Sequence, residues 1–189
     1  MVARIGRWAI DRVLGFLYAA GFFLQVIRSS AHFLHRRQLG YKVLTLQILF
    51  TGVEAVGVVS VLALALGAVI IIQGLSLLPQ FGQGRLVYSI LVTVITRELG
   101  PILTAFIIIA RSGTAIATEL GNMVVSHEIE AYVSVGVNPI SYLVVPRFIG
   151  VTLSLLLLNL YFNLFGLAGS FFVTALIRPI QFVEYFRNL

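Results

Sequence analysis

The stretch Arg85–Met123, RLVYSILVTVITRELGPILTAFIIIARSGTAIATELGNM, decides what kind of protein this is. It is an apolar run that carries Arg97, Glu98, Gly100 and Pro101 near its middle. As one helix it would measure about 55 Å, whereas the hydrocarbon core of a bilayer is about 30 Å thick. An ionisable side chain costs roughly 2.5–3.5 kcal/mol in that core, so such residues mark functional positions by default. We therefore expect a membrane segment that bends, tilts or protrudes where its charges lie.

The composition of the whole chain supports a membrane protein. Its 189 residues are 59% hydrophobic and 11% charged, whereas an ordinary soluble domain has about 25% charged residues. The formal net charge is +6, but seven of the thirteen basic residues precede the first long apolar run. This asymmetry follows the positive-inside rule, so we expect a cytoplasmic N-terminus and no nucleic-acid partner. The chain has no cysteine, which excludes disulfides and thiolate chemistry.

The N-terminal part contains one short apolar stretch, Val13–Ile27, with basic residues on both sides. We find no convincing cleavage site behind it, so we expect no cleavable signal peptide. Fifteen apolar residues are few for a membrane span, and we favour a helix along the membrane interface over a tilted transmembrane helix. Residues 1–45 are therefore assigned to a cytoplasmic or interfacial region.

Three longer apolar blocks follow, at Ile48–Leu78, Arg85–Met123 and Phe148–Ile177. We predict an all-α integral membrane protein with the N-terminal interfacial helix, three transmembrane helices and one membrane domain over residues 46–189. A cytoplasmic N-terminus would place the turn at 79–85 outside, the connection at 123–146 inside and the C-terminal tail outside. The first half of the chain does not repeat in the second, which argues against a secondary transporter built from inverted repeats.

The connection after the second block predicts a two-turn amphipathic helix. Ser126 is a plausible N-cap, and Glu128 and Glu130 fall in the first turn, where the helix dipole favours anions. Gly136 suits the position after the helix end, and a proline follows shortly. The expected apolar face consists of Ile129, Tyr132 and Val133, and the segment ends at Asn138. Two interpretations stay open: a surface helix that caps the bundle, or a docking element for a cytoplasmic partner.

The RELGP segment predicts a kink, because Pro101 has no N–H for the Arg97 carbonyl. Arg97 and Glu98 point about 100° apart on a helix, so they cannot form a simple pair within it. Either they pair with other spans in a structural role, or at least one faces a cavity or a lipid headgroup.

Two features after this segment predict structural roles. The small residues Gly113, Ala117 and Gly121 share one helix face and predict close helix packing. Arg111 and Glu119 flank this ladder, and we expect both to be structural.

The sequence gives little sign of catalysis or metal binding, and we expect neither. His127-Glu128 lacks the second histidine of a zinc-binding helix. The single lysine, Lys42, is followed by valine, so the chain has no phosphate-binding P-loop. Any energy from ATP must come from a partner.

Four motifs together resemble a known family. They are IQGL at Ile72–Leu75, RELGP at Arg97–Pro101, ARSGTAIATELG at Ala110–Gly121 and EIEAYVSVGVNPISYLVVPR at Glu128–Arg147. The chain resembles the MlaE/YrbE permeases, the membrane subunits of MCE-type ABC lipid transporters, from about Leu46 to Ile177. Members of that family usually have five membrane helices, two more than this chain carries.

The resemblance implies partners and a cargo. It implies a homodimer in the bacterial inner membrane, a cytoplasmic ABC ATPase that holds ATP and magnesium, a periplasmic hexamer of MCE-domain protein, and phospholipid. This chain would then be a transport subunit and not an enzyme. The alternatives are a non-transporting membrane scaffold and, less favoured, a secondary transporter.

The resemblance also implies roles for particular residues. A hinge is expected at Gly100 and Pro101. The expected lipid-binding residues are Ile70, Gln73, Leu77, Leu78, Phe81, Arg97, Glu98 and Leu99. The residues expected to couple the chain to the ATPase lie within 126–138 and are Ser126, Glu128, Glu130, Tyr132, Val133, Gly136 and Asn138.

Overall fold

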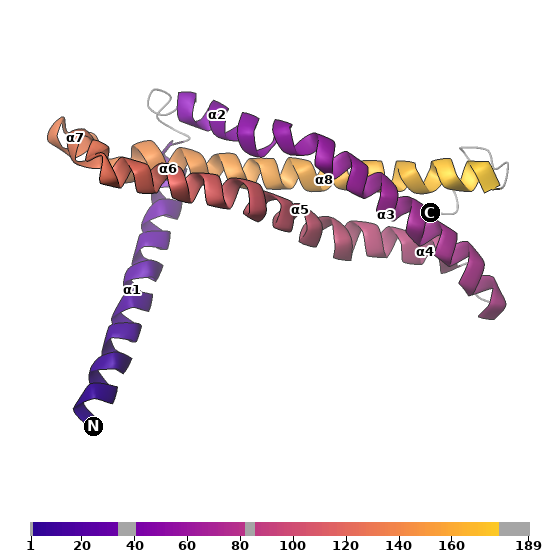
Figure 1. Cartoon of the computed structure of the whole chain (residues 1–189), viewed down its shortest axis with the longest axis horizontal. Helices are drawn as coiled ribbons and strands as arrows, with labels where there is room; N and C mark the ends of the chain where they lie inside the picture. The colour runs from indigo at the N-terminus through magenta and orange to yellow at the C-terminus, as the bar shows by residue number, and fades with distance from the viewer. Residues whose placement is uncertain (1, 34–40, 82–85, 178–189) are drawn as a thin grey trace. The chain divides into compact units, whose positions relative to one another are not determined.

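The computed structural model describes residues 2–33, 41–81 and 86–177 (Figure 1). These ranges form helices and contain no strand, so the predicted all-α class is confirmed. The α-helices are α1 (Val2–Phe33), α2 (Tyr41–Thr51), α3 (Val56–Leu77), α4 (Leu86–Thr93), α5 (Gly100–Ile108), α6 (Thr114–Val125), α7 (Glu128–Ser134) and α8 (Val145–Ile177). Short 3-10 turns, η1 (Val53–Ala55) and η2 (Leu78–Phe81), and π turns, η3 (Val94–Leu99), η4 (Ile109–Gly113) and η5 (Ile140–Val144), lie between them.

Four helical stretches of the described chain are long and apolar enough to cross a membrane. They are Ile10–Ala31, Tyr41–Gln80, Leu86–Val125 and Ile140–Leu176. The last three confirm the three predicted long spans. The first shows that the argument from length against a crossing N-terminal helix was wrong, because Val13–Ile27 is only part of a 32-residue helix. Its interfacial position stays a prediction.

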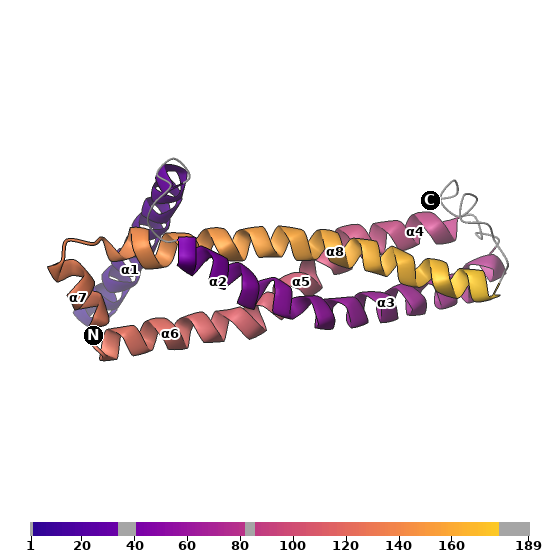
Figure 2. The same ribbon diagram turned by 90° about the horizontal axis from the view of Figure 1, so that it is seen from above.

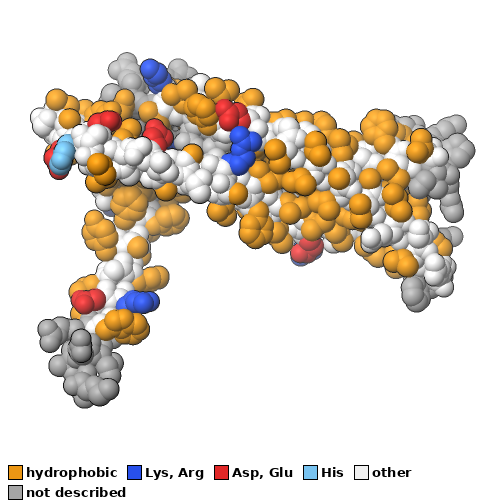
Figure 3. Space-filling model, in the orientation of Figure 1, with side chains coloured by type: hydrophobic (Ala, Val, Ile, Leu, Met, Phe, Trp, Pro, Cys, Tyr) orange, Lys and Arg blue, Asp and Glu red, His pale blue; other side chains and the backbone are white. Residues whose placement is uncertain are grey.

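The chain divides into two compact units, residues 1–47 with 121–150 and residues 48–120 with 151–189. In the second unit, α3, α4 and α5 pack beside α8 (Figures 1 and 2). Their shared core includes Val59, Ala63, Ile95 and Phe162, each fully buried. Many other apolar side chains of these helices are exposed, as a lipid environment requires (Figure 3).

Glycines allow the closest approach between α3 and α8. A Cβ on Gly67 would collide with the carbonyl oxygen of Gly166, and one on Gly169 would lie 2.7 Å from the carbonyl oxygen of Leu64. Such contacts are typical of membrane helices, whose backbones approach where side chains are small.

The small residues singled out from the sequence lie elsewhere. Gly113, Ala117 and Gly121 are all exposed, and a Cβ on Gly121 would meet nothing within 4 Å. The predicted packing ladder is therefore wrong for contacts within the described chain.

In the first unit, α1 contacts the turn η5 and the start of α8. Val26 and Ser30 are its buried side chains, and the rings of Phe23 and Phe148 meet edge to face at 6.1 Å. Most other described side chains of α1 are exposed.

Two of the three π turns end two residues before a proline. η3 precedes Gly100-Pro101, and η5 precedes Val145-Pro146. Proline cannot donate the α-helical hydrogen bond, and a π turn widens the helix locally so that it continues. The helix Leu86–Val125 thus passes through the RELGP segment, with the predicted irregularity taking the form of a π turn.

Candidate functional site

The charged pair Arg97 and Glu98 lies on the π turn η3, in the membrane-spanning helix Leu86–Val125. Both side chains are exposed on the surface of the single chain. Among the residues that the structure describes, neither has a hydrogen-bond or ion-pair partner. The structural pair with another span that the sequence left open is therefore not formed within this part of the chain. A charge in hydrocarbon needs a counter-group, and the described residues supply none for this pair.

The other expected lipid-binding residues lie on the same helix pair, since α3 packs against α4 and α5 on either side of η3. Gln73 and Leu77 are exposed on α3. Ile70, Leu78 and Leu99 are half-buried and pack against the core. Phe81 ends η2, and its side chain lies outside the described residues, as do residues 82–84 of the predicted turn. The exposed members are Gln73 and Leu77 on α3 and Arg97 and Glu98 on η3.

The segment expected to couple to an ATPase contains α7, a two-turn helix as predicted, with Glu128 and Glu130 in its first turn. Ser126 is not its N-cap, and that prediction was wrong. The Ser126 amide continues the hydrogen bonding of α6 by donating to the Asn122 carbonyl at 2.9 Å, and its hydroxyl bonds the same carbonyl and the Glu128 carboxylate. His127 takes the N-cap position with a left-handed backbone, φ 57°.

The end of α7 follows the prediction closely. Gly136 has φ +77°, its amide donates to the Val133 carbonyl at 3.0 Å, and the Val137 amide donates to the Tyr132 carbonyl at 2.9 Å. This pair of bonds is the Schellman motif, which favours glycine in the left-handed position. The Asn138 side chain accepts from the Ile140 amide at 2.9 Å and so starts the next helical turn, a role not foreseen.

One face of α7 packs inward and the other stays open. Ile129 and Tyr132 are half-buried, and the Tyr132 ring lies 5.3 Å from that of Tyr142. Val133, the third residue of the predicted apolar face, is 58% exposed. A shallow hollow of about 350 Å³ is lined by Glu128, Ala131, Tyr132 and Val135. The exposed surface of α7 therefore combines acidic and apolar groups.

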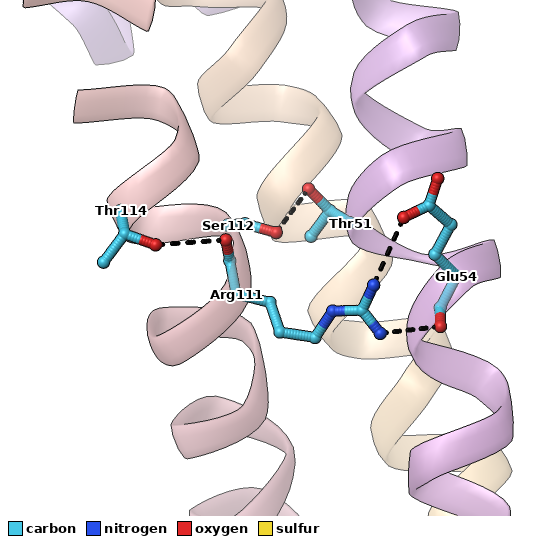
Figure 4. A network of polar contacts seen from close by, with 5 residues as sticks. All are labelled: Thr51, Glu54, Arg111, Ser112 and Thr114. Carbon is cyan, nitrogen blue, oxygen red and sulfur yellow. Dashed lines mark hydrogen bonds and ion pairs between the residues drawn. The ribbon is translucent and has the colours of Figure 1, made fainter. Parts of the chain in front are cut away.

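A polar clamp joins two of the membrane helices (Figure 4). Arg111 on η4 reaches Glu54 on η1, with Nη2 3.2 Å from the carboxylate and Nη1 donating to the backbone carbonyl at 2.8 Å. Beside it, the buried Ser112 hydroxyl donates to Thr51 Oγ1 at 2.9 Å. The structural role predicted for Arg111 is confirmed. Its partner was not foreseen, although Glu54 is the only charge between Ile48 and Leu78.

The comparisons with known proteins agree with this architecture. The family described as "Permease MlaE" matches residues 44–189. A protein of Rickettsia felis named as a probable ABC transporter permease protein is 28% identical over 173 residues, covering 92% of this chain and 67% of the relative. A Synechocystis protein of the same description is 32% identical over 145 residues, which are 75% of this chain and 55% of the relative.

A third relative carries a more specific name. The intermembrane phospholipid transport system permease protein MlaE of Haemophilus influenzae is 26% identical over 171 residues, covering 89% of this chain and 63% of its own length. The chain thus spans about two thirds or less of these relatives. Because the family match covers most of the described membrane helices, this membrane-spanning chain belongs to the MlaE permease family.

Proposed function

We propose that this chain is the permease subunit of an ATP-driven phospholipid transporter in a bacterial inner membrane. It would act as a homodimer with a cytoplasmic ABC ATPase, which holds ATP and magnesium, and with a periplasmic hexamer of MCE-domain protein. The names of the Rickettsia and Haemophilus relatives support an ABC permease and a phospholipid cargo, respectively.

The observation that carries this proposal is the exposed pair Arg97 and Glu98 on a membrane-spanning helix. A phospholipid supplies the counter-groups that the described chain does not. Its phosphate matches a guanidinium in charge and hydrogen-bonding geometry, and an amine headgroup matches a carboxylate. Exposed apolar surface on the same helix, including Ile102 one turn after Glu98, suits acyl chains.

The coupling follows from chain connectivity in this proposal. α7 would dock on the ATPase through its open acidic face, and Ser126 and His127 join it directly to α6. A push on α7 would then reach the helix Leu86–Val125, which would tilt about Gly100-Pro101 and move the lipid site toward the periplasm. The π turn η3 lies at this point, and π turns inside α-helices are frequent at functional sites.

The test is the removal of one carboxylate. In the purified complex we expect Glu98→Gln to retain assembly but to lower co-purified phospholipid and ATP-dependent lipid transfer by about tenfold or more, since a hydrogen bond to a charged group contributes roughly 1.5–3 kcal/mol. Asp11→Asn is the matched control, because it also removes one exposed carboxylate but lies on α1. Wild-type lipid content and transfer in Glu98→Gln would reject the lipid-binding role and favour the scaffold alternative.

A further inference from the structure

Two asparagines of α8 converge on Gly100 in the RELGP segment. A Cβ placed on Gly100 would lie 2.5 Å from Asn163 Oδ1 and 2.9 Å from Asn159 Oδ1. The same point is 2.9 Å from the carbonyl oxygen of Ile95, in the π turn η3. Three oxygen atoms of two helices therefore surround one small position, which only glycine leaves open.

These carboxamides are unusual in their setting. Asn159 and Asn163 are four residues apart on one face of α8, in the otherwise apolar run LLLLNLYFNLFG at 155–166. Both Oδ1 atoms are buried, and neither has a hydrogen-bond partner in the described structure. An unpaired buried polar group is costly, and no bulk water reaches the bilayer core to satisfy it.

The turn that they face is short of donors. Gly100 donates its amide to Ile95, as the π pattern requires, but the next residue is Pro101, which has no N–H to offer. A carboxamide carries an acceptor and two donors, and half a turn about its last torsion exchanges the two ends. The same side-chain positions then present Nδ2 groups near the Ile95 carbonyl of η3.

We propose that Asn159 and Asn163 are positioning residues for the lipid site. Their amide groups replace the hydrogen bond that Pro101 cannot make, hold the π turn η3, and thereby fix the directions of Arg97 and Glu98. The link to lipid rests on the function proposed above, whereas the link to the π turn does not.

The test is a double-mutant cycle in the membrane-reconstituted complex. We expect Asn159→Leu and Asn163→Leu each to lower the unfolding midpoint by about 2–4 °C and to halve the co-purified phospholipid or more. Pro101→Ala restores a backbone N–H to the turn. In its presence, the asparagine substitutions should therefore lower the unfolding midpoint and the lipid content much less. Pro146→Ala is the matched control, because it restores an N–H after the separate π turn η5. It should leave the effects of the asparagine substitutions unchanged.

The outcomes separate the two proposals. Additive effects of Pro101→Ala and the asparagine substitutions would overturn the inference, as would wild-type lipid content in the single variants. If a leucine variant does not assemble, Asn163→Ser enters the same cycle, since its shorter side chain also removes the donor. Wild-type lipid content in Glu98→Gln would instead reject the proposed function and leave the stability coupling intact.

Discussion

At the scale of single residues, four charges of the membrane helices show two different arrangements. Arg111 and Glu54 meet each other across two helices, whereas Arg97 and Glu98 have no partner among the described residues. A charge paired within the chain holds helices together, and an exposed charge without such a partner is available to a ligand. In the sequence, all four residues are simply charges within apolar runs. The structure separates the pair that packs helices together from the pair that is open to a binding partner.

The Arg111–Glu54 clamp gives a first prediction. Arg111→Ala leaves the Glu54 carboxylate without its guanidinium, so it should lower the unfolding midpoint more than the double variant Glu54→Ala/Arg111→Ala does. We expect a coupling of about 0.5–2 kcal/mol, the range seen for polar contacts in membrane proteins, because both side chains are part-exposed. Thermal unfolding of the four members of the cycle in lipid nanodiscs measures it. Strictly additive midpoints would show that the clamp contributes nothing.

Sequence reasoning identified the charged residues but not their partners. The clamp joins residues 57 positions apart, and no local pattern encodes such a contact. The cap of α7 was wrong for a related reason. Ser126 has the right side chain for an N-cap, but α6 runs on to Val125 and retains the Ser126 amide, which moves the cap to His127.

At the scale of helices, small residues contribute to helix packing only where the fold places them against another helix. Gly67 and Gly166 allow α3 and α8 to touch, whereas the more regular ladder at Gly113, Ala117 and Gly121 is exposed. Spacing of four residues shows that small side chains share a face, but it does not show which helix that face meets. The helix positions themselves could be predicted, because long apolar runs separated by Gly, Pro and charge are strong local signals.

A glycine pair in α3 tests the packing. Gly67→Ala should lower the unfolding midpoint markedly, because its Cβ would collide with the Gly166 backbone, which cannot rotate away. Gly57→Ala lies in the same helix with nothing within 4 Å of its Cβ, so it should be neutral or stabilising by up to about 1 kcal/mol. Equal effects of the two substitutions on thermal unfolding would contradict the α3–α8 contact.

The C-terminal turn of α7 gives a third prediction. Gly136→Ala places a Cβ at φ +77°, which should cost about 1–2 kcal/mol locally and loosen the end of α7. We expect weaker ATPase association, measured by titrating purified ATPase onto the permease in nanodiscs. Gly121→Ala is the control, because it has an ordinary φ and open space around its Cβ. Unchanged association with Gly136→Ala would remove α7 from the proposed interface.

At the scale of the whole molecule, the membrane orientation remains a prediction from charge. Seven basic residues precede the first long apolar run, and three long helical spans follow α1. Under the positive-inside rule this places Lys42 and α7 in the cytoplasm and η2 outside. The side on which the N-terminus lies depends on α1, since the length of this helix allows it either to cross the membrane or to lie along it.

Because the chain has no cysteine, single cysteines can report this orientation without background. Gln80 in η2, Ser134 in α7 and Asp11 in α1 are exposed and suit labelling. A thiol reagent that cannot cross membranes should modify Gln80→Cys in spheroplasts, and should modify Ser134→Cys and Asp11→Cys only after permeabilisation. External labelling of Asp11→Cys with Ser134→Cys still protected would mean that α1 crosses the bilayer. External labelling of Ser134→Cys would reverse the whole topology and with it the proposed access of α7 to a cytoplasmic ATPase.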